Sequence, residues 1–211
     1  MGDAYNRPIC SFLEGEDWID SGTLSLSRLN APVPTGTAEP AAPAAAGRKP
    51  GEKAMFDEDI KIIAKSPLGL TSAGKEIVAL LREYQKRDGI VYGPTHGDPP
   101  PRGEWDGTTI TVRDDYYPNA YKTAVELVHE AAHVIWRRGH RLGKGKTESV
   151  EEGAANEYFA VSKQIAMYKW LRDVKHCGAD YELDRRLEQE ANGTLKSAIE
   201  AREKESRGSQ Q

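Results

Sequence analysis

Apolar side chains recur three and four residues apart along four stretches of the chain, the spacing that predicts amphipathic helices. The first stretch begins at Thr71-Ser72 and ends at Asp88-Gly89. The second follows Asn119 and ends near Gly139, and the third runs from about Ser149 to Cys177-Gly178. The fourth starts at Tyr181 and carries a narrow apolar stripe among many charges, which predicts one helix packed on the edge of the domain or on a partner.

Two short strands are predicted between the first and second helices. Ile90–Tyr92 is rich in residues that favour strands, and Thr108–Val112 is entirely β-branched. The residues between these strands, Gly93 to Gly107, are rich in Pro and Gly and predict a loop. The combination predicts an α+β fold.

The second helix carries the most specific chemical motif, H-E-x-x-H, formed by His129, Glu130 and His133. Residues four apart on a helix lie within about 40° of each other, so both imidazoles can bind one metal ion. Alanines occupy both x positions and leave room for a metal and a substrate. In a metallopeptidase the ion polarises a carbonyl and acidifies a bound water, and the motif glutamate takes the water's proton and passes it to the leaving amine. Glu130 is therefore predicted as the general base.

A zinc site of this kind needs one more protein ligand. Glu152 and Asn156 form Glu-x-x-x-Asn, which resembles the Glu-x-x-x-Asp of gluzincins, whose glutamate binds zinc and whose second acidic residue orients a histidine. The resemblance implies Glu152 as the third ligand and Asn156 as the acceptor of an imidazole N–H. The asparagine departs from the gluzincin pattern and gives less charge support.

The sequence also allows other residues as the third zinc ligand. Ser149-x-x-Glu152 also fits a capping box, which would hold the glutamate on the backbone and make Glu151 the ligand; Glu148 and Glu157 are further alternatives. His140 would be the metzincin choice, but it lies one residue too late for that pattern.

A peptidase also needs a donor that stabilises the oxyanion opposite the metal. The nearest candidates are His140, just after the predicted metal-binding helix, and Tyr158, two turns after Glu152. The stretch Tyr116–Tyr121, before that helix, is the alternative source.

Residues 66 to 160 together resemble the minimal gluzincin-type metallopeptidases, and most of all the compact toxin and effector domains of bacterial secretion and polymorphic-toxin systems. Three segments carry the resemblance: Ser66–Gly74, the Leu-x-His-Glu-x-x-His helix, and the 155–160 run Ala-Asn-Glu-Tyr-Phe-Ala, which is similar to the Ala-Asn-x-Phe-Ala run of metallopeptidases that cleave phage-type repressors. The resemblance implies a zincin-like core, a zinc cofactor, a protein or peptide substrate, and an immunity or carrier protein as partner.

The sequence is compatible with two functions of different classes, an enzyme and a binding protein. As a peptidase, the protein would lay an extended peptide along Thr108–Val112 as an edge strand. As a catalytically silent binding module, it would keep the zincin fold and hold a partner protein. The intact Glu130 favours the enzyme, because this residue carries the chemistry without holding the fold.

The whole chain sets the wider limits. Its 211 residues allow one ordinary domain, expected over 55–178, followed by a charged helix and frayed tail over 179–211. Residues 1–54 are expected to be a disordered leader and linker, since 14 of the 20 residues from Ala31 to Pro50 are Ala, Pro or Gly. A net charge of −4 and a mean hydropathy of −0.67 argue against nucleic-acid binding. The sequence shows neither a Sec signal nor a membrane span, which predicts a cytoplasmic protein or one secreted by another route.

Overall fold

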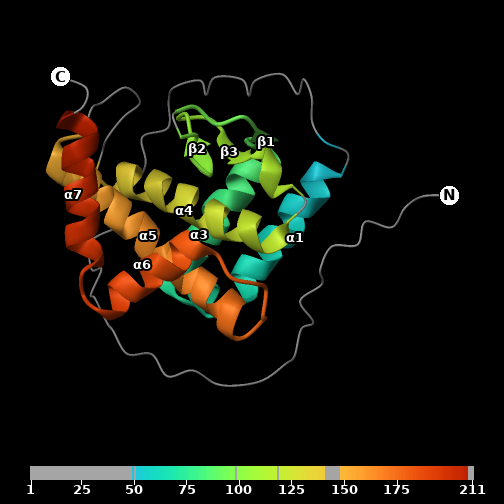
Figure 1. Cartoon of the computed structure of the whole chain (residues 1–211). Coiled ribbons are helices and arrows are strands. Elements are labelled where there is room, and N and C mark those ends of the chain that lie inside the picture. Colours follow the sequence, from blue (N-terminus) through green and yellow to red (C-terminus); the bar gives the residue numbers. More distant parts are fainter. Residues whose placement is uncertain (1–48, 50, 98, 118, 141–147, 209–211) are drawn as a thin grey trace.

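The structure is a computed structural model that describes residues 49, 51–97, 99–117, 119–140 and 148–208 (Figure 1). Within these residues it is mainly helical, with one small sheet, and so belongs to the broad α+β class that the sequence predicts. Nearly all of the predicted leader and linker lies outside the described residues. No described helix is both long enough and apolar enough to cross a membrane. The elements are α1 (Glu52–Lys65), α2 (Pro67–Leu70), α3 (Ser72–Lys86), β1 (Ile90–Gly93), β2 (Gly103–Trp105), β3 (Ile110–Arg113), η1 (Asp114–Tyr116), α4 (Ala120–Gly139), α5 (Val150–Asp173), α6 (Tyr181–Ala191) and α7 (Leu195–Gly208).

The predicted helix starts at Thr71 and Asn119 both correspond to helix N-caps. The Thr71 hydroxyl accepts from the Gly74 N–H at the start of α3, and the Asn119 side chain accepts from the Lys122 N–H at the start of α4. Each bond satisfies a backbone donor that has no partner within the first helical turn. Helix α1 was not predicted, although its buried Phe56, Ile60 and Ile63 follow the same helical spacing.

The sheet has the order β1-β3-β2, with β1 parallel and β2 antiparallel to β3. This order corrects the expectation that Thr108–Val112 supplies an edge strand. β3 pairs on both sides, and the edge strand that lies beside Glu130 of the H-E-x-x-H motif is β2. β2 was predicted as loop because its three residues, Gly-Glu-Trp, are too few to show strand alternation.

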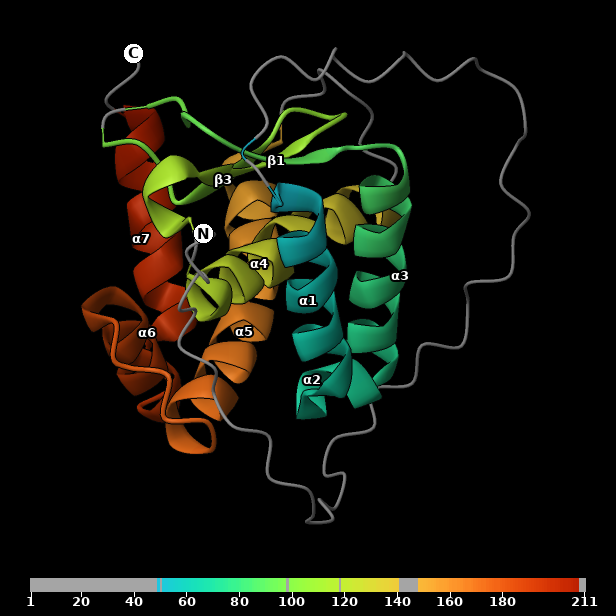
Figure 2. The ribbon, with the colours of Figure 1, turned by 90° about the vertical axis from the view of Figure 1, so that its right-hand side faces the viewer.

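Helix α4 is the central element of the core. It contacts α1, α3, α5 and the sheet, and Figure 2 shows α1 and α3 side by side below the strands. Seven apolar residues of α4 are fully buried, which fixes the helix on several sides and leaves one stripe for polar chemistry. These residues are Ala124, Val125, Leu127, Val128, Ala131, Ala132 and Val134.

The C-terminal segment forms two helices instead of the one predicted. Helix α6 ends at Ala191 with Asn192 as its C-cap, Gly193 then takes a left-handed conformation with φ of 70°, and α7 starts at Leu195. Leu195 and Ile199 of α7 are buried in a second apolar cluster with residues of α5. The pair α6 and α7 is therefore packed against the rest of the molecule (Figure 1).

Candidate metal centre

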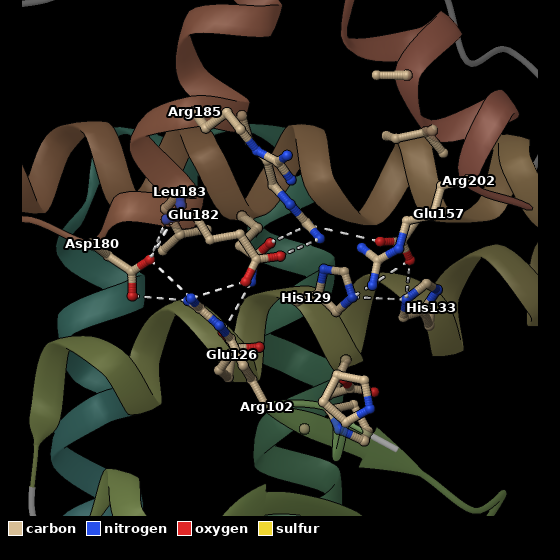
Figure 3. A pocket seen from close by; sticks show the side chains of 18 of the residues that line it. Arg102, Glu126, His129, His133, Glu157, Asp180, Glu182, Leu183, Arg185 and Arg202 are labelled. Atoms are coloured by element: carbon tan, nitrogen blue, oxygen red, sulfur yellow. Dashed lines mark hydrogen bonds and ion pairs between the residues drawn. The ribbon is translucent and has the colours of Figure 1, made fainter. Parts of the chain in front are cut away.

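Two helices bring together three side chains that could hold a metal ion: His129 and His133 from α4, and Glu157 from α5 (Figure 3). The two imidazole Nε2 atoms lie 3.0 Å apart. The Glu157 Oε2 atom lies 3.3 Å from the His133 Nε2 atom and 3.7 Å from the His129 Nε2 atom. Three potential ligand atoms thus surround one point.

The spacing of these atoms fits zinc. Zinc binds imidazole nitrogen and carboxylate oxygen at about 2.0–2.2 Å, and tetrahedral bonds of that length hold neighbouring ligand atoms roughly 3.3–3.5 Å apart. The observed separations of 3.0, 3.3 and 3.7 Å bracket this value. Two histidines and one carboxylate also form a donor set that catalytic zinc sites use, with a fourth position left for water or substrate.

The third member of this group is Glu157 instead of the expected Glu152. The Glu152 carboxylate accepts a hydrogen bond of 2.8 Å from the Ser149 N–H, and the Ser149 hydroxyl accepts one of 3.1 Å from the Glu152 N–H. This is the capping box considered from the sequence, and it holds Glu152 in the first turn of α5. Glu151, the alternative ligand, is exposed in the same turn and is likewise outside the three-residue group.

Asn156 makes the contact expected of it. Its Oδ1 atom lies 2.9 Å from the His133 Nδ1 atom, and because an amide oxygen only accepts, this nitrogen carries the proton. The Nε2 atom of His133 is then free to bind a metal. The Asn156 amide in turn donates to Glu148, which also accepts from Arg137 at 2.8 Å. This chain of hydrogen bonds fixes the orientation of the imidazole.

The protonation states of the three residues are strongly coupled. Burial lowers the pKa of His129 to about 3. Burial also lowers the pKa of His133, but the hydrogen bond and charge of Glu157 outweigh this effect and raise it to about 9. Burial raises the pKa of Glu157, and the two histidines more than reverse that effect, so the carboxylate is ionised. Metal binding is therefore expected to release the proton of His133.

Glu130 projects from α4 toward the start of β2. A Cβ atom at Gly103 would lie only 3.0 Å from the Glu130 Cγ and Oε1 atoms, so the glycine provides the space that this side chain occupies. Burial raises the pKa of Glu130 to about 7, although the charge of His133 opposes the shift. A carboxylate with a pKa near neutrality is well matched to accept and return a proton.

His129, His133, Glu157 and Glu130 line a cleft of about 1060 Å³. Neither predicted oxyanion donor lines it. The Tyr158 side chain is 37% exposed on α5, and His140 stacks on Trp136 with ring centroids 3.7 Å apart. From the alternative stretch, Tyr116 does line the cleft and is buried.

The cleft floor contains a buried carboxylate that the sequence analysis missed. Glu126 lies one turn before His129 on the same stripe of α4, accepts a hydrogen bond of 3.1 Å from Gln164, and lies 4.0 Å from Arg102 (Figure 3). Burial raises the pKa of Glu126 to about 8, although Arg102 lowers it. Glu126 lies three residues before His129 and seven before His133, so it extends the polar stripe of the helix by one turn. This spacing could have identified Glu126 as a residue of the site from the sequence.

This raised pKa predicts a pH-dependent stability. Between the unfolded value of 4.5 and the folded value of about 8, the folded protein holds a proton on Glu126 that the unfolded chain releases. The free energy of unfolding of metal-free protein should therefore fall as the pH rises through this window, by at most about 1.4 kcal/mol per pH unit from this group. In urea titrations at pH 5 and pH 8, Glu126→Gln should lose less stability than wild type. Equal losses of unfolding free energy in the two proteins would contradict the raised pKa of Glu126.

Comparisons with protein-family models, with curated proteins and with solved structures gave no significant match.

Proposed function

We propose that the protein is a zinc-dependent metallopeptidase of the gluzincin type, with a minimal zincin-like core, that hydrolyses peptide bonds of a protein substrate. The observation that carries the proposal is the convergence of His129, His133 and Glu157 on one point, with the motif glutamate Glu130 in the same cleft. The three side chains are only 12 to 23% exposed, and holding polar and charged groups this far from solvent is costly unless they have binding partners.

The residues have distinct roles in the proposed reaction. A zinc ion held by the three side chains would polarise the scissile carbonyl and acidify the attacking water. Glu130 takes the proton of that water and returns it to the leaving amine. Asn156 keeps the His133 Nδ1 atom protonated and so directs Nε2 toward the metal.

The substrate would bind along β2. This strand pairs only with β3 within the described residues, so its other edge offers backbone groups to an extended peptide. β2 begins at Gly103, which is in close contact with Glu130. A peptide paired with this edge would therefore pass next to the general base. A role as a toxin or effector stays an expectation from the sequence resemblance.

The proposal is tested by metal removal and return. Wild-type protein is incubated with a denatured, proteome-derived peptide mixture, and new termini are identified by mass spectrometry. Cleavage should stop after treatment with a chelator and resume on addition of about one equivalent of zinc. Cleavage that persists without metal, or its absence at every zinc concentration, would contradict the proposed function.

A further inference from the structure

We propose that Arg185 of α6 and Arg202 of α7 recognise acidic side chains of the substrate, so that peptides with Asp or Glu near the scissile bond are preferred. This inference rests on the proposed peptidase function and names the substrate class of the same cleft.

The two C-terminal helices form one wall of the cleft. Residues from both helices line it, and Figure 3 shows the Arg202 side chain extending from α7 toward the rings of His129 and His133. Arg185 extends from α6 into the same space. The two guanidinium groups thus come from the side opposite α4 and face the region where a peptide would meet the metal.

This wall is held firmly in place. Leu183 of α6 and Leu195 of α7 are almost fully buried. The N-cap of α6, Asp180, accepts two hydrogen bonds of 2.9 Å from Arg102, which lies just before β2. This bidentate pair joins the substrate edge of the sheet to the wall that carries the arginines. The backbone positions of both arginines are therefore fixed relative to the proposed peptide path.

The other arginines that line the cleft are already neutralised. Arg102 pairs with Asp180 and with Glu182 at 3.0 Å. Arg186 donates to Glu182 at 3.1 Å, and its Nη1 atom lies 3.7 Å from the Glu157 carboxylate. The remaining one, Arg113, forms a short ion pair with Asp115.

Arg185 and Arg202 differ from these residues. Both side chains are exposed, and neither forms an ion pair with a described residue. Within the described part of the chain, they are the two arginines of the cleft lining that form no ion pair, so their guanidinium groups remain available to a ligand. Such charge favours an anionic ligand, and a guanidinium matches a carboxylate in two-point hydrogen bonding.

The negative charge of the cleft floor favours a peptide over a nucleic acid as the ligand. Glu126, Glu157 and Glu182 lie within the same cleft, and the whole chain carries a net charge of −4. A continuous phosphate backbone would meet these carboxylates along its length, and binding such a polyanion needs an extended basic surface. A peptide with one or two acidic side chains can place them on the arginines while its neutral backbone passes the floor.

The test separates recognition from catalysis. Zinc-loaded Glu130→Gln protein, in which cleavage is suppressed, is titrated into fluorescein-labelled decapeptides that differ only in carrying four Glu, four Gln or four Lys, and anisotropy reports binding. The Glu peptide should bind most tightly. Adding Arg185→Glu or Arg202→Glu should weaken its binding about tenfold, and the double change should favour the Lys peptide. Lys204→Glu, which makes the same charge change on α7 outside the cleft, should have little effect.

Cleavage profiling gives the second measurement. Sites cut by wild type in the peptide mixture should be enriched in Asp or Glu near the new termini, and Arg202→Glu should remove that enrichment. Equal binding of the Glu and Gln peptides, or an equal loss in Lys204→Glu, would overturn the inference. Cleavage without acidic preference would overturn it and leave the peptidase intact, whereas selective Glu-peptide binding without any cleavage would support the arginine site and contradict the proposed function.

Discussion

Glu130→Gln is expected to keep the fold and bind zinc like wild type, but to cleave peptides about 10² to 10⁴ times more slowly. The amide has the shape of the carboxylate and fits the same space beside Gly103, yet it cannot accept the proton of the attacking water. Turnover on a peptide that wild type cuts, measured together with zinc content, tests this expectation.

A suitable control for this variant is Glu126→Gln. It makes the same chemical change one turn earlier on α4, in the same cleft, and should retain far more activity because Glu126 is paired with Gln164. If Glu130→Gln turned over at the wild-type rate, the assigned general base would be wrong. If both variants lost activity equally, the loss would reflect the electrostatics of the cleft instead of a specific proton transfer.

The second large effect is expected on zinc affinity, from the loss of the proposed third ligand, Glu157. Glu157→Ala should weaken zinc binding by more than the roughly 10- to 100-fold that is typical for loss of a residue that only orients a ligand. The change removes one of three donors and leaves two partly buried imidazoles without their carboxylate partner. Zinc affinity is measured by competition with a chelating dye at fixed pH, since binding is coupled to proton release.

Glu152→Ala is the matched control, because it removes an identical side chain from the same helix. It should lower the stability of the first turn of α5 slightly and keep full zinc affinity, since Glu152 serves only the capping box. The opposite result, with zinc lost in Glu152→Ala and kept in Glu157→Ala, would restore the ligand implied by the gluzincin resemblance and contradict the geometry of the site.

The sequence predicted those parts of the site that depend on local spacing. The two histidines of the H-E-x-x-H motif lie on one face because a helix fixes the relation between positions four apart. Glu157 could not be chosen in this way, because it belongs to another helix and its approach to the histidines depends on how α4 and α5 pack. The possible capping box was the one local clue against Glu152, but the sequence prediction still favoured Glu152 as the ligand, and the structure shows the box formed.

The walls of the cleft were the least predictable part. β2 is too short to give a strand pattern and is stabilised by pairing with β3. The apolar stripe from Leu183 to Ile199 suggested one helix, but Gly193 interrupts it, and the resulting turn brings α7 against α5. Arg185 and Arg202 reach the cleft only because α6 and α7 each pack against α5, and no spacing within the sequence relates these arginines to the motif.

We propose that two histidines and Glu157 hold a zinc ion, and X-ray absorption spectroscopy at the zinc edge tests this most directly. Wild-type protein loaded with one equivalent of zinc should show two imidazole nitrogens at about 2.0–2.1 Å and oxygen ligands at about 2.0–2.2 Å in a four-coordinate site. The imidazole scattering should remain in Glu152→Ala and be altered in Glu157→Ala. Failure to retain stoichiometric zinc, a spectrum without imidazole, or a sulfur ligand at about 2.3 Å would contradict the account.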